Sequence, residues 1–199
     1  MSARDDVLAL LRGQVVSRIR FTFPFLQGKG TVTIAPASFH RVARAIEAGT
    51  VRLQITTTFP PGVGGQYQSG TPNTLLVAPL LGRTEQGLLL HECTHALFDV
   101  TKTQVTDNED EAAAYVVDAL YFRMTGLRHP RWNAEPHVTA GGVADALLAA
   151  YQAGRTPVPA VDAAAWTQLR AAVMLHPVYR WGSAGIPGVL LGTGSGHDG

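Results

Sequence analysis

The five residues His91-Glu92-Cys93-Thr94-His95 constrain this chain more than any other feature of its sequence. In an α-helix, residues four apart lie on one face about one turn apart, so both imidazoles can reach the same zinc ion. Glu92 lies beside them, close enough to take a proton from a water molecule at that ion. The motif therefore requires a helix, and the hydrophobic pattern around it predicts one from Arg83 to Val100.

The apolar residues around the motif predict how this helix packs. They form a flank distinct from the face of the two histidines: Leu89, Leu90, Cys93, Ala96 and Leu97. Within that flank Cys93 is expected to be a small buried hydrophobe rather than a nucleophile. Asp99 shares the face of His95 and is expected to support a ligand at most indirectly, because one helix cannot easily wrap three ligands around one ion. Gly87 costs the helix roughly 1 kcal/mol relative to alanine.

A third ligand is expected from the acidic cluster Asn108-Glu109-Asp110-Glu111. The cluster opens a second helix, predicted from Asn108 to Met124, and a carboxylate on a neighbouring antiparallel helix can complete a His-His-Glu zinc site. Glu111 is preferred because three residues follow it at helical spacing and give it an inward face: Tyr115, Asp118 and Phe122. Two alternatives stay open, namely Glu109 as the ligand, or Glu111 as the third residue of a capping box begun by Asn108.

With these residues the chain resembles compact HExxH zincin metallopeptidases whose third ligand is a glutamate. Examples are the ImmA/IrrE-like peptidases and the metallopeptidase domains of bacterial polymorphic toxins. The resemblance rests on the HECTH motif and on Glu111-Ala112-Ala113-Ala114-Tyr115-Val116, within about residues 74 to 124. It implies an enzyme that hydrolyses peptide bonds, with one zinc ion per chain held by His91, His95 and Glu111. Glu92 would be the general base that activates water.

The resemblance also implies a substrate-binding strand and a group that stabilises the developing oxyanion. The strand immediately before the motif helix is expected to pair with an extended substrate: Thr74, Leu75, Leu76 and Val77. An ordinary buried strand fits the same apolar residues. Tyr115 and Tyr121 are the oxyanion candidates nearest in sequence, and four further side chains stay open: His129, His137, His176 and Tyr179. Asp118 either orients a histidine ligand or is a solvated helix charge.

The remaining pattern predicts an α+β fold, with a small mixed sheet in the N-terminal half and a mainly helical C-terminal half. Beyond the two motif helices we expect helices over about residues 4–17, 36–49, 139–152 and 161–175. Strands are expected over about residues 31–34, 51–57, 66–69 and 74–78. Residues 1–181 are interpreted as one domain, and the glycine-rich residues 182–199 as an irregular tail.

Composition limits the class of protein and its partners. With 16 Lys and Arg against 15 Asp and Glu, the net charge of +1 argues against a nucleic-acid-binding protein. One cysteine excludes an intramolecular disulfide and a cysteine-only zinc site. Neither a secretory leader nor a membrane span is recognisable, so we expect a cytoplasmic protein, although export by a specialised system leaves no recognisable mark. A peptide or protein is the expected substrate.

Two other functions stay open at this stage. The first is a non-catalytic binding or regulatory module, with a protein partner on the helical C-terminal part. The second is a toxin-type protease directed at one protein target. Glu92 separates the first alternative from a peptidase, because turnover requires it and the fold does not.

Overall fold

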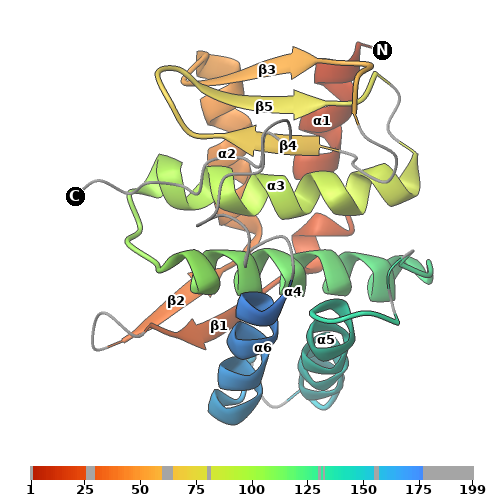
Figure 1. Cartoon of the computed structure of the whole chain (residues 1–199). Coiled ribbons are helices and arrows are strands. Elements are labelled where there is room, and N and C mark those ends of the chain that lie inside the picture. Colours follow the sequence, from red (N-terminus) through yellow and green to blue (C-terminus); the bar gives the residue numbers. More distant parts are fainter. Residues whose placement is uncertain are drawn as a thin grey trace.

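The computed structural model shown in Figure 1 describes residues 2–25, 30–59, 65–79, 82–129, 131, 133–154 and 157–176. Its elements follow one another as α1 (Ala3–Leu11), η1 (Val16–Arg18), β1 (Phe21–Pro24), β2 (Thr31–Ile34), α2 (Pro36–Ala48), β3 (Val51–Ile55), β4 (Gly65–Gln68), β5 (Asn73–Val77), α3 (Arg83–Thr101), α4 (Asp107–Thr125), α5 (His137–Gln152) and α6 (Ala163–Leu175). The expected α+β class is confirmed. The expected tail, residues 182–199, lies outside the described residues, as does Tyr179.

The strands form two separate sheets rather than the single sheet expected. In the three-stranded sheet the order is β3-β5-β4, with β3 parallel and β4 antiparallel to the central β5. The other sheet is the antiparallel pair β1-β2. Strand β1 is not among the strands expected from the sequence; its two buried phenylalanines, Phe21 and Phe23, alternate over only four residues. Such a short run gives little periodic signal.

The two motif helices, α3 and α4, pack against each other at the centre of the molecule. The three-stranded sheet lies on one side of this pair with α2, and the β1-β2 pair lies on the other with α5 and α6 (Figure 1). Close packing of α3 on α4 explains Gly87: a Cβ atom there would lie 2.5 Å from Cε2 of Phe122 and 3.0 Å from Cδ1 of Tyr121. The glycine that weakens α3 locally is therefore what allows the two helices to approach.

Five of the six expected helices are confirmed to within a few residues, and the first is shorter than expected. Its apolar pattern reaches Val15, but α1 ends at Leu11 and the chain turns through Gly13 into η1. A Cβ atom at position 13 would lie 3.0 Å from the carbonyl oxygen of Ala9. A side chain at this position would crowd the backbone carbonyl groups of Ala9 and Leu10, so glycine suits the turn that follows α1.

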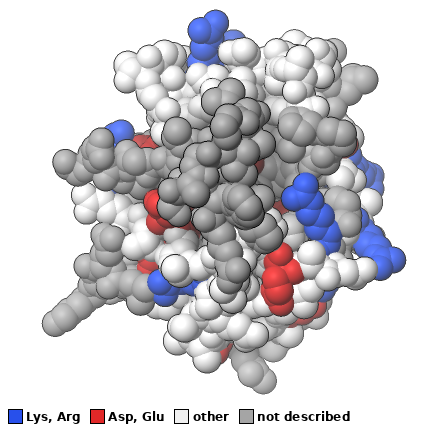
Figure 2. Space-filling model, in the orientation of Figure 1, with Lys and Arg blue, Asp and Glu red and all other residues white. Residues whose placement is uncertain are grey.

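The core runs from α1 to α6, with Trp166 buried against Phe23 at a ring-centroid distance of 4.5 Å. Among the described residues on the face seen in Figure 2, charged side chains of both signs are scattered and form no extended field of one sign. No helix of the described residues has both the length and the apolarity needed to cross a membrane.

Candidate metal centre

Helix α3 presents the motif as the sequence predicts. The expected apolar flank is buried, with each of its five side chains at most 4% exposed. His91, Glu92 and His95 are half-buried on a different face. The two histidine rings lie 5.0 Å apart, centroid to centroid, nearly perpendicular to each other. Cys93 is fully buried, and burial raises the pKa of its thiol, as expected for a hydrophobe rather than a nucleophile.

Glu111, in the second turn of α4, brings a carboxylate to both histidines. Its Oε2 lies 3.4 Å from Nε2 of His91, and its Oε1 lies 3.8 Å from Nε2 of His95. Ligands at about 2.1 Å around a tetrahedral zinc ion are separated by about 3.4 Å. Two imidazoles and one carboxylate suit a zinc ion by their chemistry, and the two distances from Glu111, one from each of its oxygens, lie near that separation. Glu92 also lies in a group with the two histidines whose candidate ligand atoms are all within 4.8 Å of one another.

The structure assigns the two neighbouring glutamates different places. Glu109 is fully buried and accepts hydrogen bonds from the backbone N–H of Thr106 at 2.9 Å and from its hydroxyl at 2.8 Å. This is the capping box of α4, so the N-cap is Thr106 and not Asn108, and the third helical position is Glu109 and not Glu111. The cap thus accounts for Glu109, while Glu111 lies beside the histidines.

Asp110 is a site residue that the sequence analysis did not single out. Its Oδ1 lies 2.7 Å from Nδ1 of His95, and its side chain is buried. A proton on Nδ1 would be shared with this carboxylate, which leaves Nε2 of His95 as the lone pair for a metal ion. The sequence indicated Asp110 only through its place in the acidic cluster of residues 108–111. The other three residues of the cluster gave the same indication.

Strand β4 positions Glu92 from the opposite side. The backbone N–H of Tyr67 donates to Oε2 of Glu92 at 2.7 Å. A Cβ atom at Gly65 would lie 3.3 Å from Cγ of Glu92, so the missing side chain lets the strand run close to the glutamate. Tyr67 also donates its hydroxyl to Oδ2 of Asp99 at 2.6 Å, and burial together with Asp99 raises the pKa of Tyr67. Asp99 thus ties β4 to α3.

The pKa values of His91, Glu92 and His95 are shifted by burial and by the charges of neighbouring side chains. Burial opposes protonation of His95, but Asp110 and Glu111 outweigh it and raise the His95 pKa well above its usual value. Burial likewise opposes protonation of His91, and Glu111 outweighs it and raises the His91 pKa. Burial raises the pKa of Glu92, although both histidines act to lower it. Without a metal the site therefore retains protons, as expected of a cation-binding cluster.

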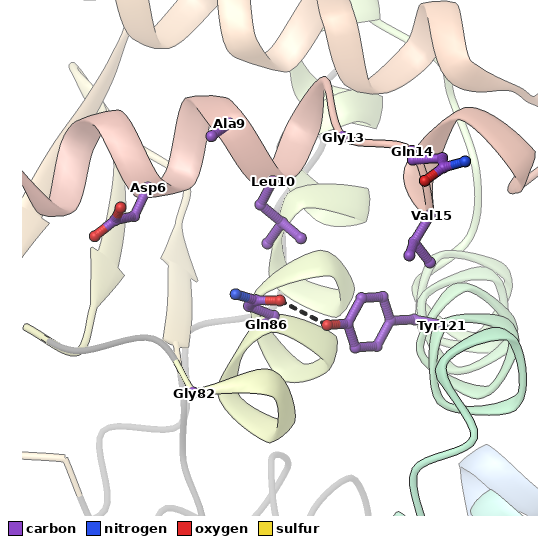
Figure 3. A pocket seen from close by; sticks show the side chains of 9 residues that line it. All are labelled: Asp6, Ala9, Leu10, Gly13, Gln14, Val15, Gly82, Gln86 and Tyr121. Atoms are coloured by element: carbon purple, nitrogen blue, oxygen red, sulfur yellow. Dashed lines mark hydrogen bonds between the residues drawn. The ribbon is translucent and has the colours of Figure 1, made fainter. Parts of the chain in front are cut away.

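Of the three residues of α4 that were candidates for orienting a ligand or stabilising the oxyanion, one lies against a motif histidine and two do not. Tyr115 packs edge-on against His91, with ring centroids 4.8 Å apart. Asp118 is buried beside His129, with Oδ2 3.1 Å from Nε2, and so is neither a solvated charge nor a partner of His91 or His95. Tyr121 points away and donates to Oε1 of Gln86 at 2.7 Å. That bond lies beside a hollow between α1 and the α3–α4 pair, lined by none of the motif residues (Figure 3).

The expected substrate strand needs correction. Thr74, Leu75, Leu76 and Val77 lie in β5, which is paired with β3 on one side and β4 on the other. A strand with both edges paired has no backbone groups for another strand. Of the alternatives considered, the buried strand is therefore the correct one, since Leu75 and Val77 are fully buried. Among the described residues β4 pairs only with β5, so β4 is the edge strand beside Glu92.

No protein-family model, curated protein sequence or solved structure matches this chain. The site is therefore interpreted from its own geometry.

Proposed function

We propose that this protein is a zinc-dependent peptidase with a zincin-like active site. The observation that carries the proposal is the meeting of Glu111 with Nε2 of both His91 and His95, at 3.4 and 3.8 Å, with the carboxylate of Glu92 beside the two histidines. Two imidazoles and one carboxylate, with a further carboxylate beside them, make up the donor set and general base of catalytic zinc sites.

The proposed roles follow from where each side chain lies. A zinc ion bound by His91, His95 and Glu111 would polarise the scissile carbonyl group and make water more acidic. Glu92 accepts the proton of the attacking water and returns it to the leaving amine. Asp110 keeps Nε2 of His95 available by holding Nδ1. Tyr115 is the one tyrosine of the two candidates that lies at the site, so it is our candidate for contact with the developing oxyanion.

The proposed substrate is an extended polypeptide laid along β4. An edge strand can add a peptide by backbone hydrogen bonding, and β4 runs directly past Glu92. The N–H of Tyr67 that faces Glu92 marks the side of β4 opposite β5. The N–H of Tyr67 is already bonded to Glu92, so a peptide on that side would pair with the remaining outward-facing groups of β4, with its scissile bond next to the general base.

The test combines zinc content with turnover. Elemental mass spectrometry should find close to one zinc per wild-type chain and little in His95→Ala. Cleavage of a fluorescence-quenched random peptide library should fall by at least about a thousandfold in Glu92→Gln, because general-base catalysis is lost while zinc is retained. Glu85→Gln, in the first turn of α3, is the matched control and should cleave at the wild-type rate. Zinc binding with no Glu92-dependent cleavage would instead support the non-catalytic binding module.

A further inference from the structure

A continuous series of ring contacts leads from the metal-binding face into the core. Tyr115 makes a T-shaped contact with His91, with ring centroids 4.8 Å apart, and another with His137, at 4.9 Å. His137 in turn lies against His129, with centroids 4.3 Å apart and the rings tilted by 34°. These rings come from α3, α4, α5 and the segment between α4 and α5, so the series joins four parts of the chain.

The series ends on a buried carboxylate. Nε2 of His129 lies 3.1 Å from Oδ2 of Asp118, and both side chains are only 3% exposed. The ring of Phe122 packs edge-on against His129 at 4.7 Å. Asp118 lies one turn of α4 beyond Tyr115, on the same side of the helix as Phe122. Helix α4 thus carries both the carboxylate that lies beside His129 and the tyrosine that contacts His91.

Asp118, His129 and His137 have candidate ligand atoms within 4.8 Å of one another, so they need to be weighed as a second metal site. Nδ1 of His129 accepts a hydrogen bond from the backbone N–H of Arg131 at 2.9 Å. An accepting Nδ1 puts the proton of the neutral ring on Nε2, towards Asp118. A metal ligand needs a free lone pair on that atom. The tautomer therefore favours a carboxylate–histidine support over a metal site.

We propose that Asp118, His129 and His137 are positioning residues that hold Tyr115 against the ligand His91. The proposal rests on the proposed zinc site but not on peptide cleavage. His137 fits this role because its residue is only 8% exposed and its ring contacts both Tyr115 and His129. Groups that hydrogen-bond a metal ligand fix its ring orientation, and their loss weakens metal binding by about 10- to 100-fold. Support that reaches His91 through the packing of Tyr115 is expected at the lower end of that range.

The first test is Asp118→Asn, with Asp145→Asn as its matched control. Asp145 joins α5 to α4 through Arg123, at 2.6 and 2.9 Å, but that pair is exposed. In competition with a chromophoric chelator, Asp118→Asn should bind zinc about 10-fold more weakly and Asp145→Asn should bind it as the wild type does. The absorption spectrum of cobalt(II)-loaded protein should shift in Asp118→Asn alone.

A second pair of variants separates ring packing from ligation. His137→Phe keeps a ring against Tyr115 and should retain zinc affinity within about threefold, whereas His137→Ala should lose about 10-fold. The imidazole NMR resonances of the metal-free protein give a readout that needs no metal. They should place the His129 proton on Nε2, and Asp118→Asn should shift the His91 resonances. Circular dichroism checks that each variant is folded.

Three results would overturn the proposal. The first is unchanged zinc affinity and unchanged His91 resonances in folded Asp118→Asn. The second is a second zinc ion per wild-type chain that is lost in both His137 variants. The third is a His129 proton found on Nδ1. Failure of the peptidase proposal is distinguishable from these results. In that case the wild type would bind zinc but cleave no peptide, and the comparisons of zinc affinity and NMR resonances would still test the positioning residues.

Discussion

Nδ1 of His95 lies 2.7 Å from Oδ1 of the buried Asp110, while Nε2 of the same ring faces Glu111 at 3.8 Å. One imidazole thus has a carboxylate at each nitrogen, and the two carboxylates come from consecutive residues of α4. The first turns of α4 therefore provide both the proposed ligand and the group that orients another ligand.

Asp110→Asn should weaken zinc binding by about 10- to 100-fold, because the amide can present its N–H₂ group to Nδ1 and favour the wrong tautomer of His95. Chelator competition at fixed pH measures the affinity. Asp107→Asn is the control, since Asp107 is an exposed acid in the same first turn. Equal affinity of both variants and wild type would show that Asp110 does not orient the ligand.

Gly65→Ala should lower kcat on the peptide library by about 10-fold and leave the zinc content at one per chain. The new methyl group would lie 3.3 Å from Cγ of Glu92, and Glu92 is also held by the N–H of Tyr67. Displacing the general base affects the proton-transfer step rather than the ligands. Gly70→Ala, whose Cβ would come no closer than 3.8 Å to the atoms around it, should have wild-type kcat. An unaltered kcat in folded Gly65→Ala would contradict the close approach of β4.

Gly87→Ala should destabilise the protein by about 1–3 kcal/mol, as expected when a methyl group is forced between packed helices. The Cβ atom would lie 2.5 Å from Phe122, although alanine favours an isolated helix. The control is Gly142→Ala in α5, where no atom lies within 4 Å of the added Cβ. Helix propensity alone then raises the stability by about 0.5–1 kcal/mol. Urea unfolding of both variants tests whether the free energy of unfolding falls in Gly87→Ala and rises in Gly142→Ala.

His137 should make the metal-free protein less stable as the pH falls. Burial, together with His129 and His91, lowers the His137 pKa to about 3. The unfolded chain then binds this proton from about pH 6.5 downwards, so the stability falls between pH 6.5 and about 3 and is unaffected above that window. Subtracting the unfolding free energy of His137→Gln from that of wild type at each pH isolates this contribution. A pH-independent difference would mean that the buried ring binds its proton as readily as the unfolded chain does.

Much of the secondary structure could be predicted because it depends on short-range patterns of apolar, glycine and capping residues. Helix α3 was predicted to within one residue at its end, and its buried flank was predicted residue by residue. Glycine and apolar periodicity did not reveal β1, since two phenylalanines in four residues are too few for a pattern. The position of the α4 N-cap was missed for a related reason: Thr106 and Asn108 are both good caps, and the choice depends on which glutamate is buried.

The sequence by itself determined that two histidines share one helix face with a glutamate beside them, because the helical period acts over four residues of continuous chain. Only the tertiary structure decided what faces them. Asp110 at His95, β4 rather than β5 beside Glu92, and His137 behind Tyr115 are all contacts between elements. Such contacts depend on how strands order and helices cross, and a four-residue periodicity carries no information about either.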